Sequence, residues 1–145
     1  MNILFICRGN VGRSQMAEAI FNDVCSGHEV KSAGTRVVNY EGENVDGQAL
    51  KDLLPGVENV FISLKEKGMD ASGKVRTQLT PEMIEWADRV VSMAEKERSP
   101  EYLLASPKTV FWDVVDPKGL SLEEHRRIRD QIEDNVKLFI EEGGL

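Results

Sequence analysis

The sequence predicts a three-layer α/β sandwich with a four-stranded parallel sheet and a phosphate loop after the first strand. Two patterns lead to this prediction. Short apolar runs alternate with helix-like stretches, and a glycine-bearing loop joins the first run to the first helix. The chain has 145 residues, of which 41% are hydrophobic, and this is the size of one domain with one core. We therefore expect a single domain over residues 1–145.

The first half of the chain begins with two strand patterns around a helix pattern. Residues 3–6 form a continuous apolar run, typical of a buried parallel strand. Residues 14–26 have helical spacing, and residues 29–33 are predicted as the second strand. Farther along, residues 46–54 have helical spacing before a Pro-Gly pair, and residues 60–68 fit another short helix.

The second half repeats the alternation. Thr80 and Pro81 predict a helix start, because threonine caps helices and proline suits the first helical position. Ser121 and Glu124 form a capping box. The remaining elements are expected at residues 89–93 (strand), 95–104 (helical or irregular), 109–112 (strand) and 120–140 (helix). Ligands of such sheets bind beyond the carboxyl ends of the strands, where Cys7 falls.

The segment after the first strand has the composition of an anion-binding loop around a thiol. Cys7 ends the apolar run, two glycines follow, and Arg13 and Ser14 lead into the helix. Backbone N–H groups at a helix start converge on negative charge, which stabilises both a thiolate and a phosphate. Arg13 adds a planar fork for two oxygens of a tetrahedral oxyanion. The alternative is a buried structural cysteine, which would not require the Gly, Asn and Arg around it.

Three segments resemble one known family. Residues 7–14, Cys-Arg-Gly-Asn-Val-Gly-Arg-Ser, resemble the phosphate loop of the low-molecular-weight protein tyrosine phosphatases and the thioredoxin-coupled arsenate reductases, which share a fold. Residues 31–35 resemble the family's Ser-Ala-Gly-Thr segment, and residues 112–119 resemble its late Asp-Pro acid loop. The resemblance implies one low-molecular-weight phosphatase-like catalytic domain. Its substrate would be a phosphorylated protein, with phosphotyrosine favoured, or a small phosphomonoester.

The loop residues then have expected roles. Cys7 is expected to attack phosphorus and form a cysteinyl-phosphate that water hydrolyses, a route that needs no metal and no cofactor. Ser14 is expected to donate its hydroxyl to the Cys7 sulfur, or to cap the helix. Asn10 suits a left-handed conformation that turns N–H groups inward, and the resemblance implies that Ser32 bonds it from behind the loop. The expected phosphate-binding residues are Arg8, Gly9, Asn10, Val11, Gly12 and Arg13.

The leaving oxygen needs a proton, and Asp116 is the expected general acid. Pro117 fixes the backbone after it, so the carboxyl can be held rigidly. Asp113 competes for this role, and without the resemblance both aspartates read as turn residues. The order of the family's motifs favours Asp116.

Two departures from the family pattern concern substrate and redox chemistry. Phosphotyrosine-specific members carry a tyrosine just after Asp-Pro, whereas this chain has Lys118. Many members have a second cysteine inside the loop, whereas this chain has Gly12. Cys25 lies at the far end of the first helix, which disfavours a disulfide with Cys7.

Arsenate reduction is the main alternative function, because arsenate is a tetrahedral oxyanion like phosphate. The segment from residue 116 onward resembles the reductase branch. No cysteine follows Cys25, so a reductase would need an external thiol donor such as thioredoxin or a glutaredoxin-like protein. A phosphate-binding module with little turnover is a third possibility.

Charge and apolar patterning exclude other classes. A net charge of −7 disfavours binding to nucleic acid and to anionic membranes, and no apolar run is long enough to span a bilayer. A nucleophilic thiol needs a reducing compartment, which indicates the cytoplasm. Arg8, Arg13 and Arg36 suggest a small positive pocket, although Arg8 and Arg36 also fit ordinary surface charges.

The segment 39–68 matches the family pattern only loosely. We treat it as a hypothetical partner surface or substrate lid. Deletion of residues 55–61 without effect on activity or assembly would remove that hypothesis.

Overall fold

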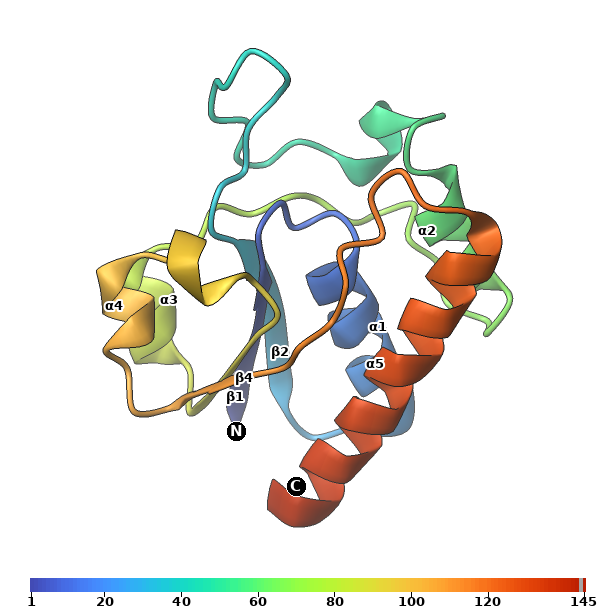
Figure 1. The fold of residues 1–145 in the computed structure, drawn as a ribbon. Helices are drawn as coiled ribbons and strands as arrows, with labels where there is room; N and C mark the ends of the chain where they lie inside the picture. Colours follow the sequence, from blue (N-terminus) through green and yellow to red (C-terminus); the bar gives the residue numbers. More distant parts are fainter. Residues whose placement is uncertain (144) are drawn as a thin grey trace.

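The chain forms a parallel four-stranded sheet with helices on both faces (Figure 1), so the predicted fold class is confirmed. The computed structural model describes residues 1–143 and 145. The strands are β1 (Asn2–Cys7), β2 (Glu29–Gly34), β3 (Arg89–Ser92) and β4 (Thr109–Phe111), in the order β2-β1-β3-β4. The α-helices are α1 (Arg13–Val24), α2 (Glu58–Lys65), α3 (Pro81–Trp86), α4 (Glu101–Leu104) and α5 (Leu122–Gly143).

The side chains of β1 alternate between two hydrophobic cores. Ile3 and Phe5 pack in the core that α1, α2 and α5 cover, whereas Leu4 and Ile6 pack in the core that α3 and α4 cover. All four side chains are fully buried. Burial from both faces explains the continuous apolar run, since a strand with one wet face would alternate.

The expected helix over residues 46–54 is wrong, because only the 3-10 turn Leu50–Leu53 is helical there. Gly47 has a φ of +87°, which interrupts a right-handed helix. Its N–H donates to the carbonyl of Arg76 at 2.7 Å, and the Arg76 N–H donates back to the carbonyl of Gln48 at 2.8 Å. Long-range backbone pairing has replaced the local helix.

The other predicted elements are confirmed, with small shifts of their ends. Helix α3 begins at Pro81 with Thr80 at the cap position, but the Thr80 side chain makes no cap hydrogen bond. The stretch 95–104 divides into a 3-10 turn (Lys96–Arg98) and α4, which begins after Pro100. Before α5, the Glu124 N–H donates to Ser121 Oγ at 3.2 Å, which is one half of the predicted capping box.

Three loops meet at the carboxyl edge of the sheet. The loop after β1 lies between the segment that follows β2 and the segment that joins β4 to α5 (Figure 1). None of the helices in the described residues is both long and apolar enough to cross a membrane.

Candidate active site

Asn10 holds the loop after β1 from within. It is fully buried and has a φ of +54°, the left-handed conformation that the sequence predicted. Its side-chain amide donates to Ser14 Oγ at 2.8 Å and to Ser32 Oγ at 3.0 Å. Its side-chain carbonyl accepts the N–H of Thr77 at 2.7 Å. Three separate segments are therefore tied to one side chain.

The backbone N–H groups of the loop are left for a ligand. Among the described residues, none of the N–H groups of residues 8–13 donates a hydrogen bond to another part of the chain. Gly34 lets the end of β2 approach this loop closely. A Cβ at Gly34 would lie 2.7 Å from the Arg8 carbonyl oxygen and 2.9 Å from the Asn10 nitrogen. Convergent N–H donors at a helix start form an oxyanion cradle.

Cys7 lies at the end of β1, at the base of this cradle. The residue is 2% exposed, and its Sγ lies 2.9 Å from Ser14 Oγ. Ser14 is fully buried within the first turn of α1, whose cap position is Gly12 and has no side-chain cap bond. Ser14 therefore contacts the sulfur and does not cap the helix. Both Cys7 and Cys25 are free thiols.

Arg13 is anchored at the carboxyl edge of the sheet. Its Nη1 donates to the carbonyl of Met93 at 2.6 Å, to that of Val114 at 3.0 Å and to the Glu95 carboxylate at 3.2 Å. Its Nη2 lies 3.9 Å from Asp116 Oδ2. Burial raises the pKa of Glu95, but its own backbone N–H and the Arg13 guanidinium outweigh burial and leave that pKa below its usual value.

The Asp-Pro segment approaches the loop from the far end of the chain. Asp116 is half exposed, and its Oδ1 accepts the N–H of Lys118 at 3.0 Å, which closes a tight turn. A Cβ at Gly12 would lie only 2.8 Å from Pro117 Cγ. Of the two candidate acids, Asp116 is the one paired with Arg13. Asp113 is exposed and contributes its backbone carbonyl to Gln131.

Arg76 also contacts the loop, although no sequence motif points to it. It is 6% exposed, and its Nε donates to the Gly9 carbonyl at 3.0 Å. Its other nitrogens donate to Gln48 and to the Val38 carbonyl. Burial lowers the pKa of Arg76, while the neighbouring Cys7 raises it. Arg76 and Gly9 are 67 residues apart in the sequence. Their contact depends on the tertiary fold, so no local motif could identify it.

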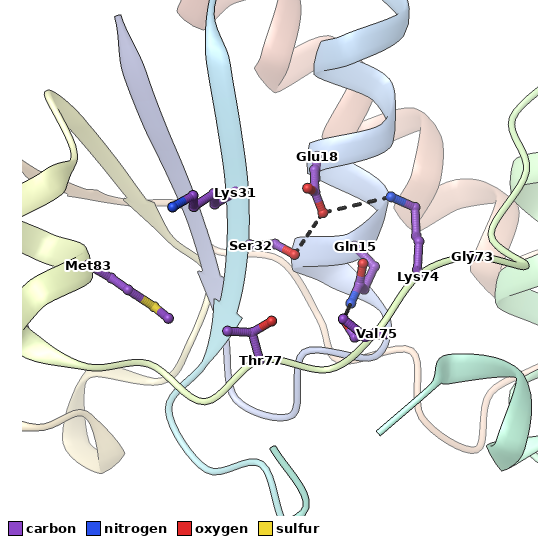
Figure 2. A pocket seen from close by; sticks show the side chains of 9 residues that line it. All are labelled: Gln15, Glu18, Lys31, Ser32, Gly73, Lys74, Val75, Thr77 and Met83. Atoms are coloured by element: carbon purple, nitrogen blue, oxygen red, sulfur yellow. Dashed lines mark hydrogen bonds and ion pairs between the residues drawn. The ribbon is translucent and has the colours of Figure 1, made fainter. Parts of the chain in front are cut away.

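A hollow of about 340 Å³ lies behind the loop, against the edge strand β2 (Figure 2). Ser32 Oγ donates to Glu18 at 2.9 Å, and Lys74 lies 3.7 Å from the same carboxylate. Gln15 donates to the carbonyls of Val75 and Asn10 at 2.9 and 3.1 Å. These bonds, drawn in part in Figure 2, fix the side of the cradle that faces away from Cys7.

Aromatic and basic side chains lie around the candidate site, at positions that we call the rim. Lys118 Nζ lies 5.6 Å from the centre of the Tyr40 ring, and Tyr40 is 94% exposed. Val11 is half buried and packs against the core. Arg8 and Arg36 line a second hollow, where Arg98 accompanies them. Arg13, which was expected in that positive pocket, lies instead against Glu95.

Comparison with known proteins agrees with this geometry. A family model described as low molecular weight phosphotyrosine protein phosphatase matches residues 2–142. A protein-arginine-phosphatase from Geobacillus stearothermophilus is 35% identical, over 96% of this chain and 93% of the relative. Arsenate reductase 2 from Staphylococcus epidermidis is 28% identical, over 94% of each chain.

Among solved structures, the low molecular weight protein tyrosine phosphatase from T. tengcongensis matches with a TM-score of 0.75 and 27% identity. The match covers 98% of this chain and 99% of that one. The sequence match, the shared fold and the loop geometry agree. The chain therefore belongs to the low molecular weight phosphotyrosine protein phosphatases, a family of cysteine-based phosphatases.

Proposed function

We propose that residues 1–145 act as one catalytic domain that hydrolyses phosphomonoesters, with protein phosphotyrosine as the favoured substrate. The observation that carries this proposal is the Cys7 Sγ at 2.9 Å from Ser14 Oγ, at the base of a loop whose N–H groups are unpaired within the described chain. A thiol in this setting has a hydroxyl partner and a cradle for three phosphoryl oxygens.

In the first step, the Cys7 thiolate attacks phosphorus, an S–P bond forms and the P–O bond to the leaving group breaks. Asp116 donates its proton to the departing oxygen. Arg13, held by Met93, Val114 and Glu95, is in place to bind the equatorial oxygens together with the backbone N–H groups of residues 8–13. Ser14 stabilises the sulfur as thiolate.

In the second step, water attacks phosphorus and the S–P bond breaks. The Asp116 carboxylate accepts the proton of that water, and inorganic phosphate leaves with the thiolate restored. Asn10 and Ser32 act by holding the loop in shape, since their bonds run behind the cradle. Each step is balanced by groups of this chain and water alone.

The proposed substrate class is inferred from the side chains at the rim of the site. Tyr40 offers an exposed aromatic face next to Lys118, so an aryl phosphate can stack at the entrance. The relative named a protein-arginine-phosphatase supports testing a phosphoarginine peptide beside a phosphotyrosine peptide. A reducing compartment, which keeps Cys7 as a thiol, supports a cytoplasmic location.

The test is release of phosphate from para-nitrophenyl phosphate in the presence of a metal chelator, with Cys7→Ser and Asp116→Ala as variants. We expect wild-type turnover that disappears in Cys7→Ser. Asp116→Ala should slow turnover about 10²-fold or more on phenyl phosphate, whose leaving group needs the proton, and by less on para-nitrophenyl phosphate. Asp113→Ala is the matched control and should retain activity. Turnover that survives Cys7→Ser would overturn the mechanism.

Arsenate reduction is the second candidate, because arsenate reductases match over nearly the full chain. It would use the same cradle with an external thiol donor. Wild-type protein is assayed on arsenate with thioredoxin, a glutaredoxin or a small thiol. Thiol-dependent reduction with little phosphate release would move the assignment to reductase. Oxyanion binding without either activity would indicate a binding module.

A further inference from the structure

Three arginines gather on one side of the phosphate loop in a protein whose net charge is −7. They line an open hollow of about 470 Å³ that we call the arginine pocket. The pocket is lined by Arg8, Thr35, Arg36, Arg98, Ser99 and Pro100.

None of these guanidiniums forms an ion pair within the described residues. Four other arginines pair with carboxylates, namely Arg13, Arg126, Arg127 and Arg129. In the part of the chain that the structure describes, no carboxylate lies within 4 Å of Arg8, Arg36 or Arg98. The Glu95 carboxylate attracts Arg98 from beyond ion-pair distance, but it pairs with Arg13, and only the Glu95 backbone carbonyl accepts the Arg98 N–H. Like charges brought together with so little counter-charge favour an external anion.

Thr35 provides a second and independent observation. Its Oγ1 is buried and has no hydrogen-bond partner among the described residues, and the residue lines the pocket. A buried hydroxyl without a partner is unfavourable, so most such groups are satisfied. Because Oγ1 itself has almost no exposed surface, a rotation of the Thr35 side chain would bring its hydroxyl to the pocket, where an anion oxygen would accept its hydrogen bond.

The pocket adjoins the catalytic loop on the side away from Asp116. The Thr35 N–H donates to the Cys7 carbonyl at 2.9 Å, and the Arg36 N–H donates to the Arg8 carbonyl at 2.8 Å. The Asp-Pro segment instead meets the loop at Gly12. A group bound among the three arginines would therefore be a neighbour of the phosphate in the cradle.

We propose that the arginine pocket binds a second anionic group of the substrate, a carboxylate or a phosphate, beside the phosphate that is cleaved. This rests on the proposed phosphatase function and adds the substrate class. Guanidinium forks match both oxyanions, whose geometry is similar. The acidic body repels polyanions elsewhere, so this pocket selects substrates with a negative charge at one defined place.

The experiment compares kcat/KM for matched substrates with the full chain. One pair is a phosphotyrosine peptide flanked by glutamates and the same peptide flanked by glutamines. The other pair is phenyl phosphate and its analogue with a second phosphate on the ring. We expect wild-type protein to prefer the doubly anionic member of at least one pair by about fivefold or more, and the preference to shrink at high ionic strength.

The variant Arg36→Gln/Arg98→Gln is expected to bring this preference close to one, and Thr35→Val to reduce it. Arg127→Gln, which removes an exposed arginine on α5, is the control and should keep the wild-type preference. A preference confined to the peptides assigns a carboxylate, and one confined to the ring phosphates assigns a phosphate. No preference in wild type, or one that survives the double variant, overturns the inference. Absence of all Cys7-dependent turnover would instead overturn the proposed function.

Discussion

Gly12→Ala tests how the Asp-Pro segment is positioned. Gly12 has a φ of −106°, outside the left-handed region that favours glycine. The added Cβ, however, would lie 2.8 Å from Pro117 Cγ, whereas ordinary contact begins at 3.4 Å. The proline ring must therefore recede by about 0.6 Å to restore ordinary contact. Because Asp116 Oδ1 is bonded to the Lys118 N–H, the turn that contains the acid moves with it.

A displacement of this size should weaken proton donation by Asp116 more than attack by Cys7. Misplacement of a catalytic group by about 1 Å can cost ~10²-fold, so a shift of about 0.6 Å should cost about tenfold. We expect kcat/KM to fall about tenfold for phenyl phosphate, whose leaving group needs a proton. The fall should be no more than about threefold for para-nitrophenyl phosphate, whose leaving group needs the proton far less.

Gly73→Ala is the matched control, because a Cβ there would meet nothing within 4 Å. Both variants are checked by thermal unfolding. If Gly12→Ala lowered kcat/KM equally for the two substrates, or left both at the level of Gly73→Ala, the steric link from the loop to the acid would be refuted.

Three further predictions concern the residues that hold the loop and helices. Asn10→Ala loses a buried hydrogen-bond set and forces alanine to a φ of +54°, so unfolding free energy should drop by about 2–4 kcal/mol in urea titrations; an unchanged midpoint would contradict this. Arg76→Lys keeps the charge but not the fork, and kcat/KM should fall about tenfold on aryl phosphates. A wild-type kcat/KM in Arg76→Lys would show that a positive charge at position 76 is sufficient for activity. Hydrogen bonds from Arg126 and Arg129 lower the pKa of Glu66 from 4.5 to about 2, so its stabilisation is complete above pH 4.5 and disappears as the pH falls to 2. The difference in unfolding midpoint between wild type and Glu66→Gln should close over that window, and a constant difference would argue against the ion pairs.

Local patterns predicted much of the fold. The continuous apolar run of β1 and the Pro81 helix start are signals contained within a few residues, and both appear in the structure. The helix over 46–54 failed for the opposite reason. Its helical spacing is real, but pairing of Gln48 with Arg76 decides the backbone there, and no window of local sequence contains that information.

The candidate site likewise combines features that the local sequence predicts with features that depend on distant segments. The left-handed Asn10 and the approach of Ser14 to Cys7 follow from one short loop, because neighbours in sequence are forced to be neighbours in space. The contact of Arg76 with Gly9 depends on where a distant segment crosses the loop. The proximity of Asp116, and not Asp113, to Arg13 likewise depends on which carboxylate the 112–119 segment turns toward Arg13.

The sequence alone thus determined the fold class and pointed to Cys7 and the candidate phosphate loop, since strand and helix periodicity and a contiguous motif are encoded locally. Tertiary structure decided the burial of Arg76, the anchoring of Arg13 by Glu95 and the meeting of Arg8, Arg36 and Arg98 in one pocket. Those contacts join residues far apart in the chain, and their free energy is gained only once the sheet has brought its carboxyl ends together.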